Sequence, residues 1–160
     1  MAARDNARNI RRTGKRAGRL LGPIDTFNFE NYEPIHIEET AEKCNIVIRL
    51  TGDHKVCIYC HDGLEALFPW GSKIQSVSDV PVRGKPCTLA IDRQRYRCEK
   101  CKHFSSMPLP GLHPKRRMTL RLFNYIRDAA ALKTFAAIAR MVGLSEKTVR
   151  NVIGDSHVQG

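Results

Sequence analysis

Residues 56–63 read VCIYCHDG and contain two cysteines separated by two residues. The same spacing returns in CEKC at residues 98–101, after the intervening stretch 61–97. One such pair is compatible with a redox motif, half of a metal site or ordinary core packing. Two pairs in one chain favour a metal site, because a redox motif needs only one pair and zinc prefers four tetrahedral thiolate or imidazole ligands. We therefore predict one structural zinc ion (Zn2+) bound by Cys57, Cys60, Cys98 and Cys101.

Two histidines and two further cysteines also carry atoms that can bind a metal, but each is a weaker candidate than the paired cysteines. His61 and His103 each lie beside a pair and could replace a sulfur, but four thiolates already complete the ligand shell. Such a shell leaves no position for water or substrate, so the zinc is expected to stabilise the fold and to take no part in chemistry. Cys44 and Cys87 alternate with apolar neighbours and are predicted to be buried thiols.

Composition restricts the class of protein. The chain has 160 residues, which suits one compact domain or two small modules and argues against a large enzyme. Its net charge of +11 points to nucleic acid as the partner, since each neutralised phosphate releases counterions. No apolar run approaches the ~20 residues of a membrane span, and the basic N-terminus is not followed by a secretory apolar region. We expect a soluble, cytoplasmic, nucleoid-associated protein without a membrane contact.

The pattern along the chain predicts an α+β fold, with a small β-rich zinc ribbon before a three-helix module. Residues 1–22 are basic and are predicted to form a disordered arm, either a solvated tail or a DNA clamp. Residues 23–106 are assigned to the ribbon. Within them, the acidic stretch 24–51 alternates like two strands with a turn near residues 40–43, and 67–98 resembles a hairpin that turns between Pro81 and Gly84.

The C-terminal part has helical periodicity. Residues 107–118 are rich in proline and are predicted to be a linker, and residues 119–160 are predicted to form a helix-turn-helix domain. Thr134 and Ser145 are suited to cap the second and third helices. The expected apolar stripes of the three helices are Leu120, Phe123, Ile126 and Ala130, then Phe135, Ile138, Ala139 and Val142, and finally Val149, Val152 and Ile153.

The segment 135–154, FAAIARMVGLSEKTVRNVIG, satisfies the steric needs of a helix-turn-helix. Ala139 is small where the two helices approach, and Gly143 permits a left-handed turn. The alternative is a pair of helices packed for stability only, but the polar face of the last helix favours DNA binding.

Three groups of residues are candidates for contacting DNA. The last helix offers side chains for base edges, the helix starts offer hydroxyl and amide groups for phosphates, and a basic run ahead of the helices offers contacts to the backbone. The run includes Arg93, Arg95 and Arg97, which alternate along one strand, and two arginines in the linker, where we expect no fixed scaffold. The candidate residues are Glu146, Lys147, Arg150 and Asn151 for bases, Thr134, Ser145 and Thr148 for phosphates, and Arg116, Arg117 and Arg121 for the backbone.

These features occur in an order that resembles a known family. The chain resembles the N-terminal region of bacterial insertion-sequence transposases of the ISL-three family. The resemblance rests on LLG at 20–22, an acidic β pair, CIYC, DVPVRGKPCTLAIDRQRYRCEKCKHF at 79–104 and IARMVGLSEKTV at 138–149. One departure is Lys102, because the family usually has glycine after the last cysteine. The resemblance implies a zinc ribbon and a helix-turn-helix that recognises the inverted terminal repeats of the element during transposition, a form of DNA recombination.

Members of that family continue into an RNase H-like catalytic domain with three acidic residues, whereas residues 155–160 are all that follow Gly154 here. Asp79, Asp92, Asp128 and Asp155 are expected to be solvated or capping, and they do not suggest a nuclease site. We therefore predict a sequence-specific, double-stranded DNA-binding protein without catalysis, with a homodimer as one possible assembly. The alternatives are the DNA-binding subunit of a transposase completed by a separate catalytic chain, or a zinc-ribbon module whose helices bind protein.

Overall fold

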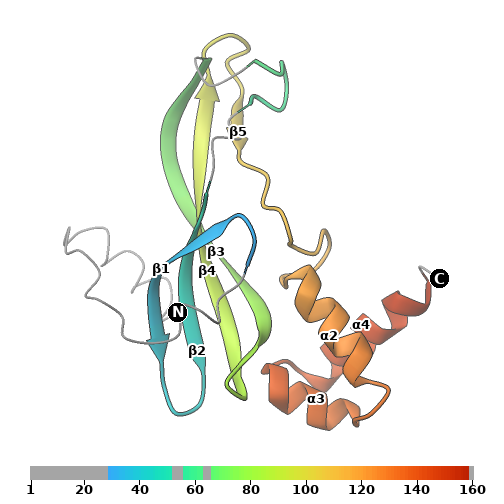
Figure 1. Cartoon of the computed structure of the whole chain (residues 1–160). Helices are drawn as coiled ribbons and strands as arrows, with labels where there is room; N and C mark the ends of the chain where they lie inside the picture. The colour runs from blue at the N-terminus through green and yellow to red at the C-terminus, as the bar shows by residue number, and fades with distance from the viewer. Residues whose placement is uncertain (1–28, 52–55, 63–65, 159–160) are drawn as a thin grey trace. The chain divides into compact units, whose positions relative to one another are not determined.

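The computed structural model describes residues 29–51, 56–62 and 66–158 (Figure 1). The predicted basic arm, residues 1–22, lies outside the described residues. A five-stranded sheet precedes three helices, so the predicted α+β class is confirmed. None of the described helices combines the length and the apolar character that crossing a membrane requires.

The acidic segment forms the predicted pair of strands. Strand β1 covers Tyr32–Glu39 and β2 covers Cys44–Leu50. The turn between them is closed by Thr40, whose amide N–H donates to the Lys43 carbonyl (2.9 Å) and whose Oγ1 accepts from the Lys43 amide (3.1 Å). A side chain that bonds its own turn is a typical reason for threonine at such a position.

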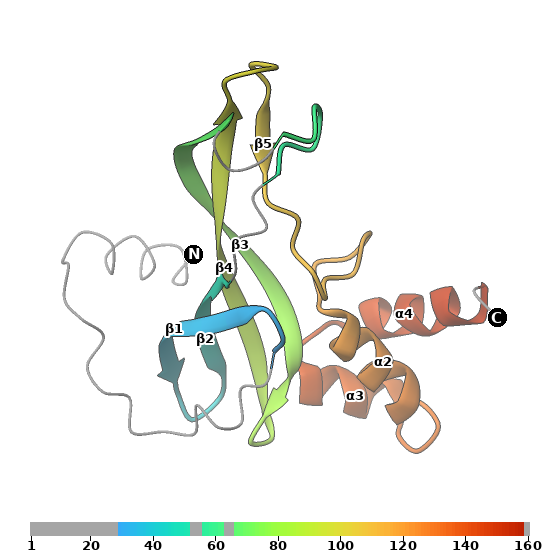
Figure 2. The same ribbon diagram turned by 45° about the horizontal axis from the view of Figure 1, so that its top comes forward.

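The long hairpin is also confirmed. Strand β3 covers Leu67–Val82, β4 covers Lys85–Cys98, and the two turn residues Arg83 and Gly84 have φ angles of 51° and 73°. Two consecutive positive φ angles match the tight turn whose twist suits a hairpin. The sheet order is β1-β2-β4-β3, and the short strand β5, Phe104–Ser106, pairs antiparallel with β4 (Figure 2).

Contacts divide the chain into two compact units. Of the described residues, the first unit comprises 29–36, 47–51, 56–62, 66–75 and 90–110, and the second comprises 37–46, 76–89 and 111–158. Neither unit is a continuous segment of the chain, because the long strands β3 and β4 contribute residues to both units. The domain bounds proposed from the sequence stay a prediction.

The first unit has a small apolar core beside the cysteine pairs. A cluster of few residues excludes little water, so the structure around the cysteine pairs gains from an additional source of stability such as a metal ion. Two of the four paired cysteines belong to this core. Its buried members are Cys57, Ala66, Leu67, Tyr96, Cys98 and Met107.

The second unit contains the three predicted helices, α2 at Leu120–Ala129, α3 at Phe135–Val142 and α4 at Glu146–Val158. The prediction for the first helical stripe was wrong at Leu120, which is exposed, whereas Leu122 is fully buried. The reason is helical geometry: with 3.6 residues per turn, Leu120 lies on a different side of the helix from the buried Leu122 and Ile126. The fully buried side chains of this core include Leu122, Ile126, Ile138, Val149 and Val152.

The proline-rich segment 107–118 contains neither helix nor strand, but the expectation that it lacks a fixed scaffold is wrong. The amide of Ser78 donates to the carbonyl of Arg117 (3.0 Å), and the amide of Thr119 donates back to the carbonyl of Ser78 (3.0 Å). Met118 between them is buried. The backbone around the two linker arginines is therefore held against β3, a contact between distant residues that local sequence does not reveal.

Candidate metal centre and nucleic-acid interface

The first cysteine pair lies in a tight turn with its own hydrogen bonds. The amide of Cys57 donates to the carbonyl of Asp62 (2.8 Å), and the amide of His61 donates to the carbonyl of Cys57 (2.9 Å). His61 has a left-handed φ of 59°. This turn brings the Cys57 and Cys60 side chains to the same side, as two ligands of one ion require.

The second pair repeats the same arrangement. The amide of Cys98 donates to the carbonyl of His103 (3.0 Å), and the amide of Lys102 donates to the carbonyl of Cys98 (2.9 Å). Lys102 occupies the place of His61, with a φ of 62°. A left-handed backbone at this position explains why glycine suits it best.

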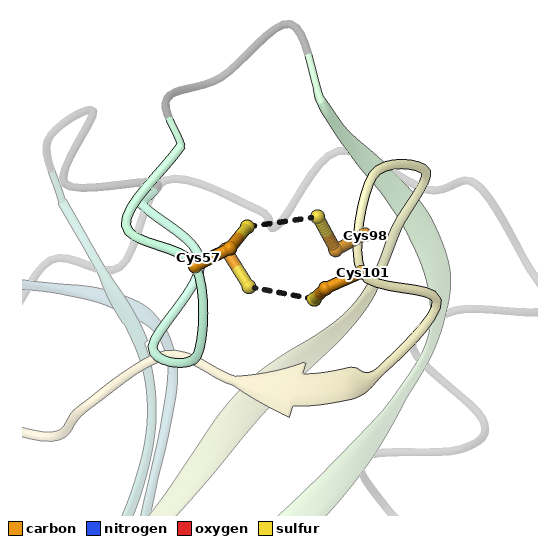
Figure 3. A group of neighbouring side chains, drawn as sticks. Cys57, Cys98 and Cys101 are labelled. Atoms are coloured by element: carbon orange, nitrogen blue, oxygen red, sulfur yellow. Dashed lines mark hydrogen bonds between the residues drawn. The ribbon is translucent and has the colours of Figure 1, made fainter.

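The two turns bring the four sulfur atoms together. The sulfurs of Cys57 and Cys101 lie 3.5 Å apart, those of Cys60 and Cys98 lie 3.6 Å apart, and all four fall within 4.8 Å of one another (Figure 3). A tetrahedron with zinc–sulfur bonds of about 2.3 Å has sulfur–sulfur edges of about 3.8 Å. The cluster therefore fits a single tetrahedral metal ion with four thiolate ligands.

The backbone favours a thiolate at Cys57, whereas burial and hydrogen bonds with neighbouring sulfurs raise the pKa of Cys60 and of Cys101. The pKa of Cys57 is lowered to about 6, because the amide of Cys60 and then that of Tyr59 donate hydrogen bonds to its sulfur. Metal binding to cysteine requires the deprotonated form, so these donors prepare the ligand.

The other candidate ligands lie elsewhere. Among the residues that the structure describes, the cluster holds only cysteines, and the ring of His103 instead stacks on Tyr59 with centroids 4.5 Å apart. Cys44 and Cys87 are buried, which confirms their predicted environment. Burial is the largest cause that raises the pKa of both thiols, so neither favours the reactive thiolate.

Replacing Lys102 with glycine is expected to stabilise the protein by about 1 kcal/mol, because a left-handed non-glycine residue is strained by roughly that amount. The lost ion pair with Glu99 is largely exposed on both sides and contributes little. Urea unfolding of zinc-loaded protein measures the change. Lys100→Gly in the same turn is the control and should lose stability, since Lys100 is not left-handed. A loss of stability in both variants would contradict the strain argument.

The helix-turn-helix follows the predicted local chemistry. Thr134 caps α3 by accepting from the amide of Ala137 (3.2 Å), and Gly143 ends this helix with a φ of 69°. A Cβ on Gly143 would lie 2.7 Å from the Cβ of Pro86, so glycine is required by space as well as by conformation. The turn between α3 and α4 therefore lies directly against Pro86 of β4.

Helix α4 presents a polar face to solvent. Lys147, Arg150 and Asn151 are exposed, whereas Val149 and Val152 are fully buried. The side chain of Glu146 accepts a hydrogen bond from Arg150 one turn later. This polar face lies opposite the apolar stripe of Val149 and Val152, as the sequence pattern predicted.

The hydroxyl groups at the helix starts already act as caps. Ser145 Oγ accepts from the amide of Thr148 (3.1 Å) and lies 2.8 Å from the Thr148 hydroxyl. Thr134 and Ser145 are exposed and Thr148 is partly exposed. The amide groups of these first turns therefore remain near the surface, where an anion is favourable.

Two of the three predicted backbone arginines have acidic partners. Arg116 Nε donates to the exposed carboxylate of Asp155 (3.0 Å), while Arg121 Nε donates to Asp79 Oδ1 (2.7 Å). The side chain of Arg117 is exposed. The three arginines, which the charge pattern alone does not distinguish, therefore differ in their ion pairs and in their exposure.

The prediction that Asp79 and Asp92 are solvated or capping is wrong. Asp79 is fully buried and also accepts from the Thr119 hydroxyl (2.7 Å), and Asp92 is buried with Arg49 3.8 Å away. Asp79 stands two residues after the buried Val77 on β3, so strand alternation was the signal that could have placed it inside. Sequence reasoning missed this network because its partners are distant in the chain.

Residues 107–156 match the family model described as the helix-turn-helix domain of transposase family ISL3. No curated protein and no solved structure matches the chain. The matched segment contains α2, α3 and α4, so these helices form a helix-turn-helix domain of that family, and this domain implies DNA binding. The four-cysteine cluster lies in the β-rich region before it, which is consistent with a zinc ribbon.

Proposed function

We propose that this protein binds double-stranded DNA in a sequence-specific manner, with α4 as the helix that enters the major groove. The observation that carries the proposal is the exposed polar face of α4 on a helix-turn-helix domain of a transposase family. In helix-turn-helix proteins the second helix of the motif presents its first turns to base edges. The exposed positions of α4 are polar, which favours DNA over an apolar protein partner.

The side chains on this face suit base recognition. Arg150 can donate two hydrogen bonds to a guanine, Asn151 can pair with an adenine, and Lys147 can donate to a guanine. In the free protein Arg150 is bonded to Glu146 one turn earlier. An exposed pair at this spacing is weak, so a base can replace Glu146 at low cost.

The phosphate contacts are assigned to the helix starts and the linker. Thr134, Ser145 and Thr148 place hydroxyl and amide donors at the N-termini of α3 and α4. Arg117 is the best candidate for an electrostatic contact. Arg116 would first have to leave the exposed Asp155, and Arg121 would have to leave the buried Asp79, which is far more costly.

A zinc ion is the proposed occupant of the cysteine cluster. Cys57, Cys60, Cys98 and Cys101 would hold it, and the ion would supply stability and no chemistry because every ligand position is filled. The distances between the sulfurs support this proposal.

Arg150→Ala is expected to weaken binding to the preferred duplex by about 1–3 kcal/mol and to relax the preference at one base position. Arg117→Ala is expected to weaken all duplexes alike and to lower the slope of log K against log salt by about one. Salt titrations of both variants on the preferred duplex and on a scrambled duplex measure these effects. The matched control is Arg127→Ala, an exposed arginine at the end of α2 whose carboxylate neighbour is Asp128. Equal weakening of both duplexes by Arg150→Ala would mean that α4 does not read the sequence.

The target is proposed to be an inverted terminal repeat of an insertion sequence, because the matched family is a transposase family. Selection of bound duplexes from random DNA tests this. Two half-sites separated by about one helical turn would indicate that a homodimer binds, whereas one short site would indicate a monomer. Recovery of no preferred sequence would contradict sequence-specific recognition.

A further inference from the structure

The first unit carries an exposed aromatic surface that the helix-turn-helix does not use. We call it the aromatic face and define it by Phe68, Trp70, Arg97 and Phe104. The three aromatic residues are 51%, 53% and 43% exposed, respectively. Large aromatic side chains usually bury most of their area, so a group of them in water marks a binding surface.

Strand pairing places these side chains on one face. Arg97 of β4 is the antiparallel partner of Phe104 of β5, and directly paired residues point to the same side of a sheet. The ring of Trp70 meets the ring of Phe104 edge-on, with centroids 5.4 Å apart and an interplanar angle of 60°. Phe68 lies two residues before Trp70 on β3, so strand alternation predicts the same side for it.

The aromatic face is also basic. The guanidinium carbon of Arg97 lies 5.7 Å from the ring centroid of Trp70 and 5.9 Å from that of Phe104. Arg95, two residues earlier on β4, is exposed. The nearby acid Glu99 is bonded to Lys102 (2.7 Å).

One donor on this face has no acceptor. The Nε atom of Arg97 is buried and has no hydrogen-bond partner in the part of the chain that the structure describes. A buried donor without a partner is costly, and an incoming acceptor group would remove that cost. The face therefore combines ring surfaces for stacking with an arginine whose buried Nε atom has no acceptor among the described residues.

We propose that the aromatic face binds single-stranded DNA through unpaired bases that stack on Trp70 and Phe104, while Arg97 and Arg95 contact the phosphates. Stacking on exposed aromatic rings beside basic residues is the general mode of single-strand recognition, and it tolerates any base sequence. A duplex offers only base edges and phosphates, because its base faces are already stacked on one another. The basic face and the net charge of +11 favour a polyanion over a protein partner. This site goes beyond duplex reading by α4 and does not depend on it.

Trp70 is the one tryptophan of the 160-residue sequence, so its fluorescence reports directly on the aromatic face. The full-length, zinc-loaded protein is titrated with an oligothymidine of about 16 nucleotides and, separately, with a blunt duplex of the same length and unrelated sequence. Stacking of a base is expected to quench Trp70 emission with the single strand, and the duplex is expected to leave it unchanged. Equal quenching by both forms, or no quenching by either, would overturn the proposal.

Variants test whether stacking supplies the affinity. Phe104→Ala is expected to weaken oligothymidine binding, measured by anisotropy of a labelled strand, by about 5- to 100-fold. Trp70→Phe keeps a ring and should stay within a few-fold of the original affinity. Leu132→Ala removes an 88% exposed apolar side chain in the second unit and should have no effect. The difference caused by Phe104→Ala should persist at high salt, where non-specific attraction is screened. An unchanged affinity in Phe104→Ala protein with its zinc retained would contradict the assignment.

One further variant separates this inference from the proposed function. Arg150→Ala should lose discrimination between duplexes and should keep its affinity for oligothymidine. Failure of duplex recognition with intact quenching would reject α4 as the reader and leave the aromatic face supported. Intact duplex recognition without quenching would support α4 as the reader and reject the aromatic face as a binding site for single strands.

Discussion

Replacing Cys98 with serine is expected to unfold the part of the first unit around the cysteine pairs, while the three helices of the second unit stay folded. A structural zinc site contributes about 10–16 kcal/mol of apparent binding free energy, which equals or exceeds the whole stability of a typical domain of about 5–15 kcal/mol. The apolar core around Cys57 and Cys98 is small, so little else can maintain the structure around the cysteine pairs after the metal is lost. Val47, Ile48 and Ile91 of the same unit are buried outside this core and do not depend on the metal in this way. Chelation of the metal from the unaltered protein should have the same effect.

Hydrogen exchange resolved along the chain measures the difference between the units. Amides in 56–62, 66–75 and 90–106 should lose protection in Cys98→Ser, whereas those of α2, α3 and α4 should keep it. Metal analysis should give about one zinc per chain for the original protein. Cys44→Ala is the matched control, because Cys44 is a buried cysteine outside the cluster and its loss should leave the zinc content unchanged. A folded, reduced protein without zinc would refute the metal site.

The second large effect is expected at Asp79, where alanine should destabilise the second unit by about 3–5 kcal/mol. The carboxylate is fully buried and receives hydrogen bonds from the Thr119 hydroxyl and from Arg121. Without it, the partly buried Arg121 guanidinium loses the carboxylate that accepts its hydrogen bonds. Thr119 also caps α2 by accepting from the amide of Leu122 (3.2 Å), so the same loss affects the start of this helix.

Thermal unfolding monitored by helical circular dichroism measures this change. A double-mutant cycle with Arg121→Ala should show that the two losses are not additive, because either variant breaks the same pair. Asp128→Ala is the control, since that carboxylate is 71% exposed beside Arg127 and should change stability by no more than about 0.5 kcal/mol. Additive losses at Asp79 and Arg121 would show that the two side chains do not depend on each other.

Several parts of this protein follow from short-range chemistry and could be predicted from the sequence. Two residues between cysteines place both sulfurs on one side of a turn, and the recurrence of that spacing indicated four ligands. Thr134 and Gly143 mark the ends of α3 because a cap and a left-handed turn need those residue types. The turn at Gly84 and the alternation of β4 were predictable for the same reason, since strand and turn preferences depend on immediate neighbours.

Other features required the tertiary structure. Asp79 and Arg121 are separated by 42 positions, and Arg116 and Asp155 by 39, so neither pairing can be read from local spacing. From the charge pattern, Arg116, Arg117 and Arg121 were therefore predicted to be equivalent contacts for DNA. In the structure, Arg116 is paired with Asp155 and Arg121 with Asp79, whereas Arg117 is exposed and no ion pair is described for it.

The aromatic face is the clearest example of a feature that could not be predicted from the sequence. From sequence alone, Phe68 and Trp70 on β3 and Phe104 on β5 have the composition of core residues, and nothing in their spacing separates an exposed position from a buried one. Their exposure depends on which side of the sheet the core of the first unit covers, and pairing of β5 with β4 then brings Phe104 beside Arg97. Local chemistry determined where the turns, caps and paired cysteines lie, because those depend on a few consecutive residues. Only the tertiary structure decided which charges are paired and which rings meet water, because these depend on burial by distant parts of the chain.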